Sequence, residues 1–256
     1  MKIGLGQPVE KEDYYHREDI VDEITELLKG GDNILIASPR RTGKTSILKH
    51  IENSPPDNFE PVYMYVGHID TEEKYFEQLF KAVVASGSFS KREQKLIKGW
   101  NWAKHCFDDI TINVGGTGID FNTKARNIYT ETFIDLVRNS KLDKKLLLLV
   151  DEFPITVSKI IEKEGAHNAT MFLEVNRRLR IDSTISSKVQ VVYTGSIGLR
   201  HVVKGINASD TINDLIKVEV TPLSLPDARE LAKLLLKGRE NTIEDIVLDY
   251  MLETKI

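Results

Sequence analysis

Residues 33–46 read N-I-L-I-A-S-P-R-R-T-G-K-T-S. The first part of this stretch, residues 34–37, is a short apolar run of the kind that forms a strand buried on both faces. Beyond the stretch, Ile47, Leu48 and Ile51 are spaced as on one face of a helix. The sequence therefore predicts a strand, a tight loop and a helix in direct succession.

The loop between strand and helix matches the phosphate-binding P-loop pattern G-x-x-x-x-G-K-[S/T], with Ser38 in place of the first glycine. Serine would be restricted there if the turn required a positive φ. Gly43 permits close approach of the backbone to a phosphate, and the positive end of the helix faces the same anion. Lys44 is expected to reach the β- and γ-phosphates, and the Thr45 hydroxyl to ligate Mg²⁺. The candidate nucleotide-binding residues of the loop are Ser38, Pro39, Arg40, Arg41, Thr42, Gly43, Lys44, Thr45 and Ser46.

A second apolar run, residues 146–150, ends in the acidic pair Asp151 and Glu152. It is typical of a central buried strand, whose carboxyl end is where ligands bind in an open α/β sheet. Asp151 would hold Mg²⁺ through water, and Glu152 would accept a proton from the attacking water. Placed after a P-loop, this run indicates the second half of an NTPase site.

Three further candidate residues lie at or beyond the end of the predicted strand over residues 189–194. If that strand lies beside the one that ends in the acidic pair, Thr194 or Ser196 would contact the γ-phosphate or the attacking water. Arg200 would reach the phosphate or a neighbouring subunit, or would be an ordinary cation on a helix face. We expect Lys44, Glu152, Thr194, Ser196 and Arg200 to form the catalytic set.

Aromatic and basic residues precede the first predicted helix, among them Tyr15 and Arg17. They would pack on the base of a nucleotide. The alternative is that the tyrosines attach this helix to the core.

The order of the strand and helix patterns predicts an α/β fold with a parallel five-stranded core sheet. Residues 216–220 alternate apolar and polar residues, as an edge strand does. Residues 86–125 interrupt the alternation of strands and helices with a basic helix that carries two tryptophans, followed by a hairpin with a glycine turn. This insertion would bind nucleic acid or a protein partner, or would be a solvated face with packed aromatic residues.

We divide the chain into a P-loop core over residues 1–222, with the insertion at about 86–125, and the start of a helical lid over residues 223–256. Two predicted helices are too few for a stable domain, so we expect the lid to be incomplete in this sequence. Within the core, Pro154 is expected to break the chain after the acidic pair, before a long helix over residues 166–180.

The composition is that of an ordinary soluble globular protein, with 41% hydrophobic and 29% charged residues among 256. A net charge of −4 provides no overall attraction to nucleic acid but leaves room for a local basic face. Cys106 is the only cysteine, which excludes an internal disulfide framework and fits a reducing compartment. With no long apolar run and no signal pattern at the N-terminus, we expect a cytoplasmic protein without membrane partners.

With these residues collected, the sequence resembles the AAA+-related signal-transduction ATPases of the STAND class, in particular the archaeal-type ATPase clade. The features that carry the resemblance are Y-x-x-R-E at residues 14–18, P-R-R-T-G-K-T-S at 39–46, L-V-D-E-F at 149–153, and T-G-S-I-G at 194–198 with P-L-S at 222–224. The resemblance implies a core sheet in the order 5-1-4-3-2, a helical domain, often a winged helix, and ATP-controlled switching. The sequence departs from the pattern at Ser38 and has no winged-helix region, so nucleic-acid binding by that route is not implied.

Two functions remain open. The first is a Mg²⁺-dependent ATPase that acts as a slow switch, binding ATP or ADP between core and lid. The second is an initiator-like or partner-binding module with little turnover of its own, whose partner is a protein, nucleic acid or a second copy of the chain. A kinase or GTPase is less favoured, because the only segment near a guanine-reading pattern, residues 139–143, has the wrong spacing.

Overall fold

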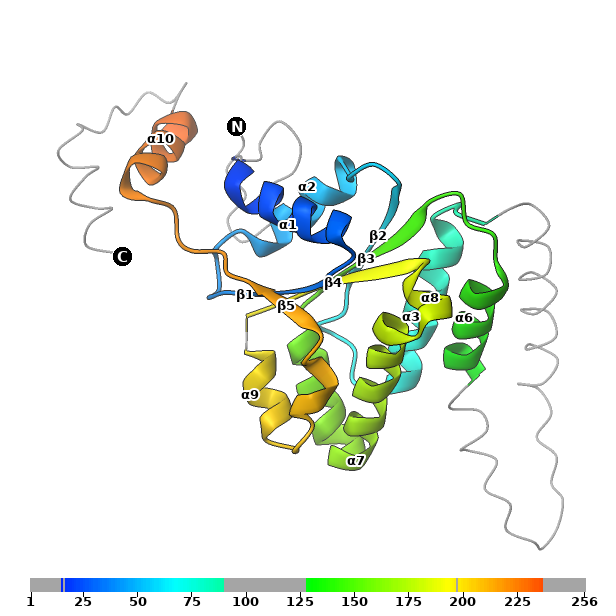
Figure 1. Cartoon of the computed structure of the whole chain (residues 1–256). Coiled ribbons are helices and arrows are strands. Elements are labelled where there is room, and N and C mark those ends of the chain that lie inside the picture. Colours follow the sequence, from blue (N-terminus) through cyan, green and yellow to red (C-terminus); the bar gives the residue numbers. More distant parts are fainter. Residues whose placement is uncertain (1–14, 16, 90–127, 197, 237–256) are drawn as a thin grey trace, which may run out of the picture.

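The computed structural model describes residues 15, 17–89, 128–196 and 198–236 (Figure 1). The insertion predicted over residues 86–125 therefore lies outside the described residues except for 86–89. The described helices and strands are α1 (Glu18–Gly30), β1 (Asn33–Ala37), α2 (Lys44–Asn53), β2 (Phe59–Tyr65), α3 (Glu72–Ala85), α6 (Ile128–Asn139), β3 (Lys145–Asp151), α7 (Phe153–Ile181), α8 (Ser183–Ser186), β4 (Val189–Gly195), α9 (Leu199–Lys204), the 3₁₀ helix η2 (Ser209–Ile212), β5 (Leu215–Val218) and α10 (Leu225–Leu236).

The described strands form one five-stranded parallel sheet in the order β2-β3-β4-β1-β5. This confirms the predicted α/β fold class and the expected strand order, read here from the opposite edge. β5 is an edge strand as predicted, although it spans residues 215–218 rather than 216–220. Because parallel strands end at the same edge of a sheet, the P-loop after β1 and the acidic pair at the end of β3 lie on one side of the molecule.

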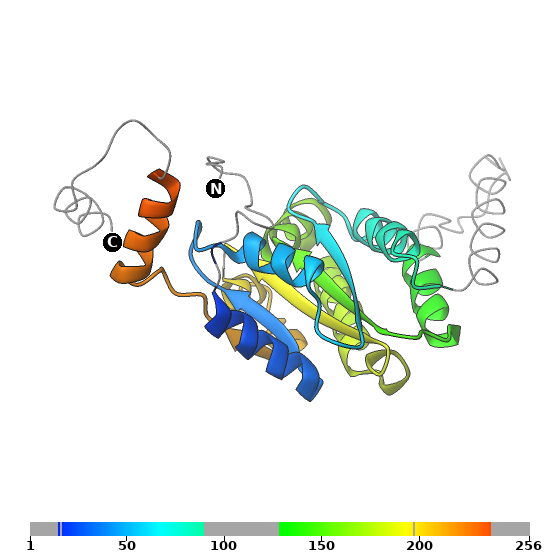
Figure 2. The ribbon, with the colours of Figure 1, turned by 90° about the horizontal axis from the view of Figure 1, so that it is seen from above.

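Helices cover both faces of the sheet (Figures 1 and 2). The side chains of β3 alternate between them. Leu147 and Leu149 pack in a core with residues of α1 and α2. Leu146 and Leu148 pack on the opposite face, with residues of α3, α6 and α7. Burial on both faces is the physical reason why residues 146–150 of β3 are all apolar.

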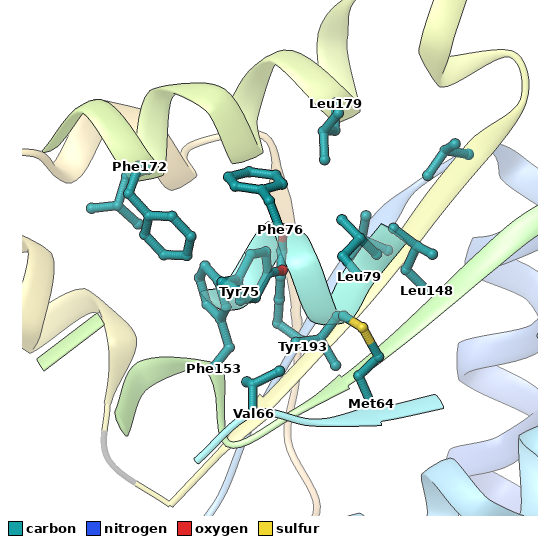
Figure 3. Close-up of a cluster of buried hydrophobic side chains, with 14 of the residues drawn as sticks. Met64, Val66, Tyr75, Phe76, Leu79, Leu148, Phe153, Phe172, Leu179 and Tyr193 are labelled. Carbon is teal, nitrogen blue, oxygen red and sulfur yellow. The ribbon is translucent and has the colours of Figure 1, made fainter. Parts of the chain in front are cut away.

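An aromatic cluster fills the core on the side of α3 and α7 (Figure 3). The ring centroid of Phe153 lies 4.1 Å from that of Tyr193 and 5.7 Å from that of Phe172. Phe172 in turn packs edge-on against Tyr75, with 4.9 Å between the centroids. Such aromatic pairs stabilise a fold by about 0.5–1.5 kcal/mol beyond the effect of burial alone. Because Phe153 directly follows the acidic pair, its burial holds the chain where it leaves the sheet.

The prediction that Pro154 breaks the chain is wrong. α7 begins at Phe153, and Pro154 lies in its first turn. Proline is accepted there because the first turn of a helix makes no use of its N–H groups. The helix predicted over residues 166–180 is the second part of α7, whose helical backbone is interrupted at Gly165 by a φ of 86° and a ψ of 165°.

Pro154 also packs against the end of β4, where a Cβ on Gly195 would lie 2.4 Å from its Cγ and Cδ atoms. We therefore expect Gly195→Ala to lower the free energy of unfolding by about 1–3 kcal/mol, the usual range for overpacking. Urea denaturation measures this change. Gly30→Ala is the control, because its Cβ would meet only a flexible Asp32 side chain, at 3.3 Å. Equal stability of the Gly195→Ala variant and the unchanged protein would contradict the prediction.

Helix α10 lies apart from the layers that surround the sheet and follows an extended segment (Figures 1 and 2). The Tyr15 hydroxyl donates to Glu230 Oε2 at 3.0 Å, so the N-terminal end of the described chain contacts this helix.

Over the described residues, no helix is both long enough and apolar enough to span a membrane.

Candidate functional site

The loop after β1 has positive φ angles at Arg41 (67°) and Gly43 (90°), and Ser38 is not among the residues with positive φ. The backbone therefore does not require glycine at position 38. The Ser38 hydroxyl accepts a hydrogen bond from the Val220 N–H at 2.6 Å. Serine thus connects the start of the loop to the segment after β5, which a glycine could not do.

The end of the loop carries groups that can donate hydrogen bonds to an anion. Gly43 is the N-cap of α2, and no side chain caps the helix, so its first N–H groups are suited to an external anion. Lys44 is only 6% exposed. Its Nζ donates to Ser38 O at 2.9 Å and to Pro39 O at 2.5 Å. The ammonium group is therefore held against the carbonyls of its own loop. An anion bound there would compete with these carbonyls for the ammonium group.

Charges around Lys44 act in opposite directions. Burial lowers the pKa of Lys44 below its ordinary value, and Arg40 lowers it further. The carboxylates of Glu152 and Asp151 raise it. The pKa of Lys44 therefore depends on both residues of the acidic pair.

The remaining loop residues are more accessible. Pro39, Arg40 and Arg41 are exposed, and Ser46 is half-buried in the first turn of α2. The Thr42 hydroxyl donates to Pro39 O at 3.1 Å, which closes the loop on itself. The two arginines thus surround the loop with positive charge.

Asp151 ends β3 and accepts hydrogen bonds from three hydroxyl groups, although its side chain is almost fully buried. Thr45 Oγ1 donates to Oδ2 at 2.7 Å, and the Tyr63 hydroxyl donates to the same oxygen at 3.2 Å. Thr194 Oγ1, at the end of β4, donates to Oδ1. The structure therefore brings the candidate metal residues Thr45 and Asp151 into contact and adds Thr194 beside them.

Tyr63 was not among the site residues predicted from the sequence. It lies on β2, which pairs with β3, and its ring is half-buried. Lys49 Nζ lies 3.6 Å from the centroid of this ring. Burial and the nearby Asp151 carboxylate raise the pKa of Tyr63 well above its ordinary value. The phenol therefore stays protonated, and its O–H donates the hydrogen bond to Asp151. The only signal in the sequence was an aromatic residue in a strand, which does not identify its neighbour.

Glu152 connects β3 to α7 with a φ of 63° and a ψ of 33°. A residue other than glycine is strained in this region by roughly 1–3 kcal/mol, and such strain occurs at functional sites. Its Oε2 accepts hydrogen bonds from the Ser196 N–H at 3.1 Å and the Ser196 hydroxyl at 3.2 Å. Glu152 and Ser196 therefore lie together, at the same end of the sheet as the P-loop.

Three predicted site residues lie farther from these contacts. Arg200 is exposed on α9, and no described contact brings it to the P-loop or the acidic pair. Arg17 donates from Nη2 to Thr221 O at 2.9 Å, one residue from the amide that Ser38 binds. Tyr15 contacts α10 through Glu230, and burial, reinforced by that hydrogen bond, raises its pKa to about 12. Tyr15 and Arg17 thus lie where the P-loop core meets α10.

The oxygen atoms of Thr45 and Asp151 are suitable ligands for Mg²⁺. The Thr45 hydroxyl and the Asp151 carboxylate offer hard oxygen ligands 2.7 Å apart. Mg²⁺ is commonly bound by one or two protein oxygens together with water and the phosphate oxygens of a nucleotide.

No family model matches the sequence, and no curated protein matches it. The structure is similar to the Walker-type ATPase PABY2304 of Pyrococcus abyssi, with a TM-score of 0.60 and 18% identity over 98% of this chain and 66% of that chain. It is also similar to the ORC1 protein of Aeropyrum pernix, solved in complex with DNA, with a TM-score of 0.58 and 13% identity over 96% of this chain and 56% of that chain. The ORC2 protein of the same organism, in its ADP form, has a TM-score of 0.54 and 11% identity over 95% of this chain and 60% of that chain.

These similarities concern the fold. They show that this chain shares the α/β fold of these proteins, built on the five-stranded parallel sheet. The chain spans 56% to 66% of the length of these solved chains. Membership of the STAND class remains a hypothesis.

Proposed function

We propose that this chain is an ATP-binding, Mg²⁺-dependent ATPase of the AAA+/STAND type that acts as a slow conformational switch. The observation that supports it most is the 2.7 Å contact between Thr45 on the P-loop helix and Asp151 at the end of β3. A P-loop hydroxyl and a strand-end carboxylate are the pair that holds Mg²⁺ in P-loop NTPases. These two residues come from different sequence motifs, so their contact argues for one site.

In this proposal the N–H groups of residues 40–45 and the Lys44 ammonium would bind the phosphates, while Thr45 and Asp151 would hold Mg²⁺. A bound metal would neutralise negative charge on the phosphates. Glu152 accepts the proton of the attacking water. Ser196 orients Glu152 by holding Oε2, which leaves the other carboxylate oxygen, Oε1, for the water.

The switch would operate between a core of residues 1–222 and a lid that begins in residues 223–256. Tyr15 of the core donates a hydrogen bond to Glu230 on α10, so this contact links the two parts. A nucleotide that contacts both parts would favour one arrangement of core and lid over the other. Arg200 would then contribute to phosphate binding from this chain or from a neighbouring copy. A reducing, cytoplasmic location remains our expectation.

The second candidate is an initiator-like module that binds DNA or a protein and turns over little ATP. It is kept because the ORC1 protein, one of the structures with a similar fold, was solved in complex with DNA. A DNA affinity that falls steeply with increasing salt would favour this candidate.

The deciding experiment is a titration of the purified chain with ATP and with GTP, each with and without Mg²⁺, followed by measurement of phosphate release. We expect ATP to bind more tightly than GTP, Mg²⁺ to strengthen ATP binding, and phosphate release to be slow. Failure to bind either nucleotide would overturn the proposal.

A further inference from the structure

We propose that Tyr63 is a positioning residue for the metal, because its hydroxyl holds the Asp151 carboxylate in the orientation that Mg²⁺ requires. Tyr63 would not itself contact the metal or the phosphates. This inference rests on the proposed ATPase function, since it concerns how the same site binds Mg²⁺.

The argument begins with the donors on each carboxylate oxygen. Thr194 donates to Oδ1, whereas Thr45 and Tyr63 both donate to Oδ2. A hydroxyl that ligates Mg²⁺ does so through its oxygen lone pair. The hydroxyl hydrogen stays available, so Thr45 can ligate Mg²⁺ and still donate to Oδ2. Tyr63 and Thr194 hold the Asp151 carboxylate without being candidate metal ligands, one on each oxygen.

Two donors on opposite oxygens fix a carboxylate group more firmly than one donor does. Without Tyr63, the donor to Oδ2 that remains among the described residues is Thr45, whose hydroxyl is also the candidate metal ligand. Tyr63 holds Oδ2 from β2, independently of the position that Thr45 takes at the metal. Hydrogen bonds of this kind, from residues just outside a metal's own ligands, are known to tune metal affinity.

Tyr63 is itself held in place. It lies in the middle of β2, opposite Leu149 in the parallel pairing with β3. Lys49 Nζ lies 3.6 Å from the centre of its ring and also forms an ion pair with Glu52 at 2.9 Å. Lys49 is four residues after Thr45, so both lie on the same face of α2. The helix that carries the candidate metal ligand therefore also holds the ring of Tyr63.

The test is Tyr63→Phe, which removes the hydroxyl and keeps the ring for Lys49. We expect the Mg²⁺ concentration needed for half-maximal binding to the ATP complex to rise about tenfold. This is the low end of the 10- to 100-fold effect of such outer hydrogen bonds. ATP affinity in EDTA is expected to stay unchanged, because the phosphate-binding loop is not altered. Calorimetric titration of Mg²⁺ into the chain saturated with ATP measures the first quantity, and ATP titration in EDTA measures the second.

The matched control is Tyr65→Phe, which makes the same chemical change two residues later on β2, where the side chain is 48% exposed. It should leave both quantities unchanged. An unchanged Mg²⁺ requirement in Tyr63→Phe would overturn the inference, as would an equal loss of ATP affinity in EDTA, which would indicate general damage to the site. If the unaltered chain bound no ATP under either condition, the proposed function itself would fail.

Discussion

Lys44→Ala is expected to abolish nucleotide binding at ordinary concentrations of ATP. Removing one partner of a buried charged interaction costs about 2–5 kcal/mol, which corresponds to a loss of affinity of roughly 30-fold to several thousand-fold. The effect should be large because Lys44 is almost fully buried and its Nζ already lies within the P-loop, on the carbonyls of Ser38 and Pro39. Calorimetry or a fluorescent ATP analogue measures the affinity.

Two further variants make the Lys44 prediction specific. Lys44→Met keeps most of the side-chain volume and removes the charge, so it should lose affinity as Lys44→Ala does. Lys29→Ala removes an exposed lysine that pairs with Glu26 on α1 and should leave ATP binding unchanged. Undiminished ATP affinity in Lys44→Ala would rule out the phosphate-binding role of the loop.

Glu152→Gln is expected to retain ATP binding and to slow hydrolysis by about 10²- to 10⁴-fold, the usual contribution of a general base. Glutamine has the same shape, and its amide oxygen still accepts the hydrogen bonds that Ser196 donates to Glu152. The variant therefore removes basicity and leaves the local geometry in place. Phosphate release in a single turnover, measured together with ATP affinity, separates the chemical step from binding.

Glu162→Gln is the control for this change, since Glu162 is an exposed residue on the same helix, α7. It should hydrolyse ATP at the rate of the unaltered chain. Normal turnover by Glu152→Gln would mean that another group accepts the proton. A slow basal rate in the unaltered chain would not weaken the comparison, because the prediction concerns the ratio of the two rates.

The placement of candidate site residues in the fold could be predicted where neighbouring residues carry the information. The apolar runs before the P-loop and before Asp151 identified two central strands, because a strand buried on both faces must be apolar throughout. The end of such a strand is also the ligand-binding edge of an open sheet. The positions of Lys44, Thr45, Asp151 and Glu152 at this edge follow directly.

Other features depended on contacts between distant segments. A proline after a strand is compatible with a chain break or with the first turn of a helix. The packing of Phe153 against Tyr193, Phe172 and Tyr75 holds the chain where α7 begins, and this packing joins distant segments. The role of Ser38 likewise became visible through Val220, a residue 182 positions away in the chain.

The amino-acid sequence by itself determined the α/β class, the two strand ends and the kinds of side chain available for phosphate and metal. The tertiary structure decided which of those side chains meet. Tyr63 contacts Asp151 because β2 pairs with β3 in parallel, in a register that places Tyr63 opposite Leu149. That pairing is set by backbone hydrogen bonds and by packing on both faces of the sheet. These interactions join segments far apart in the chain, so no local pattern encodes them.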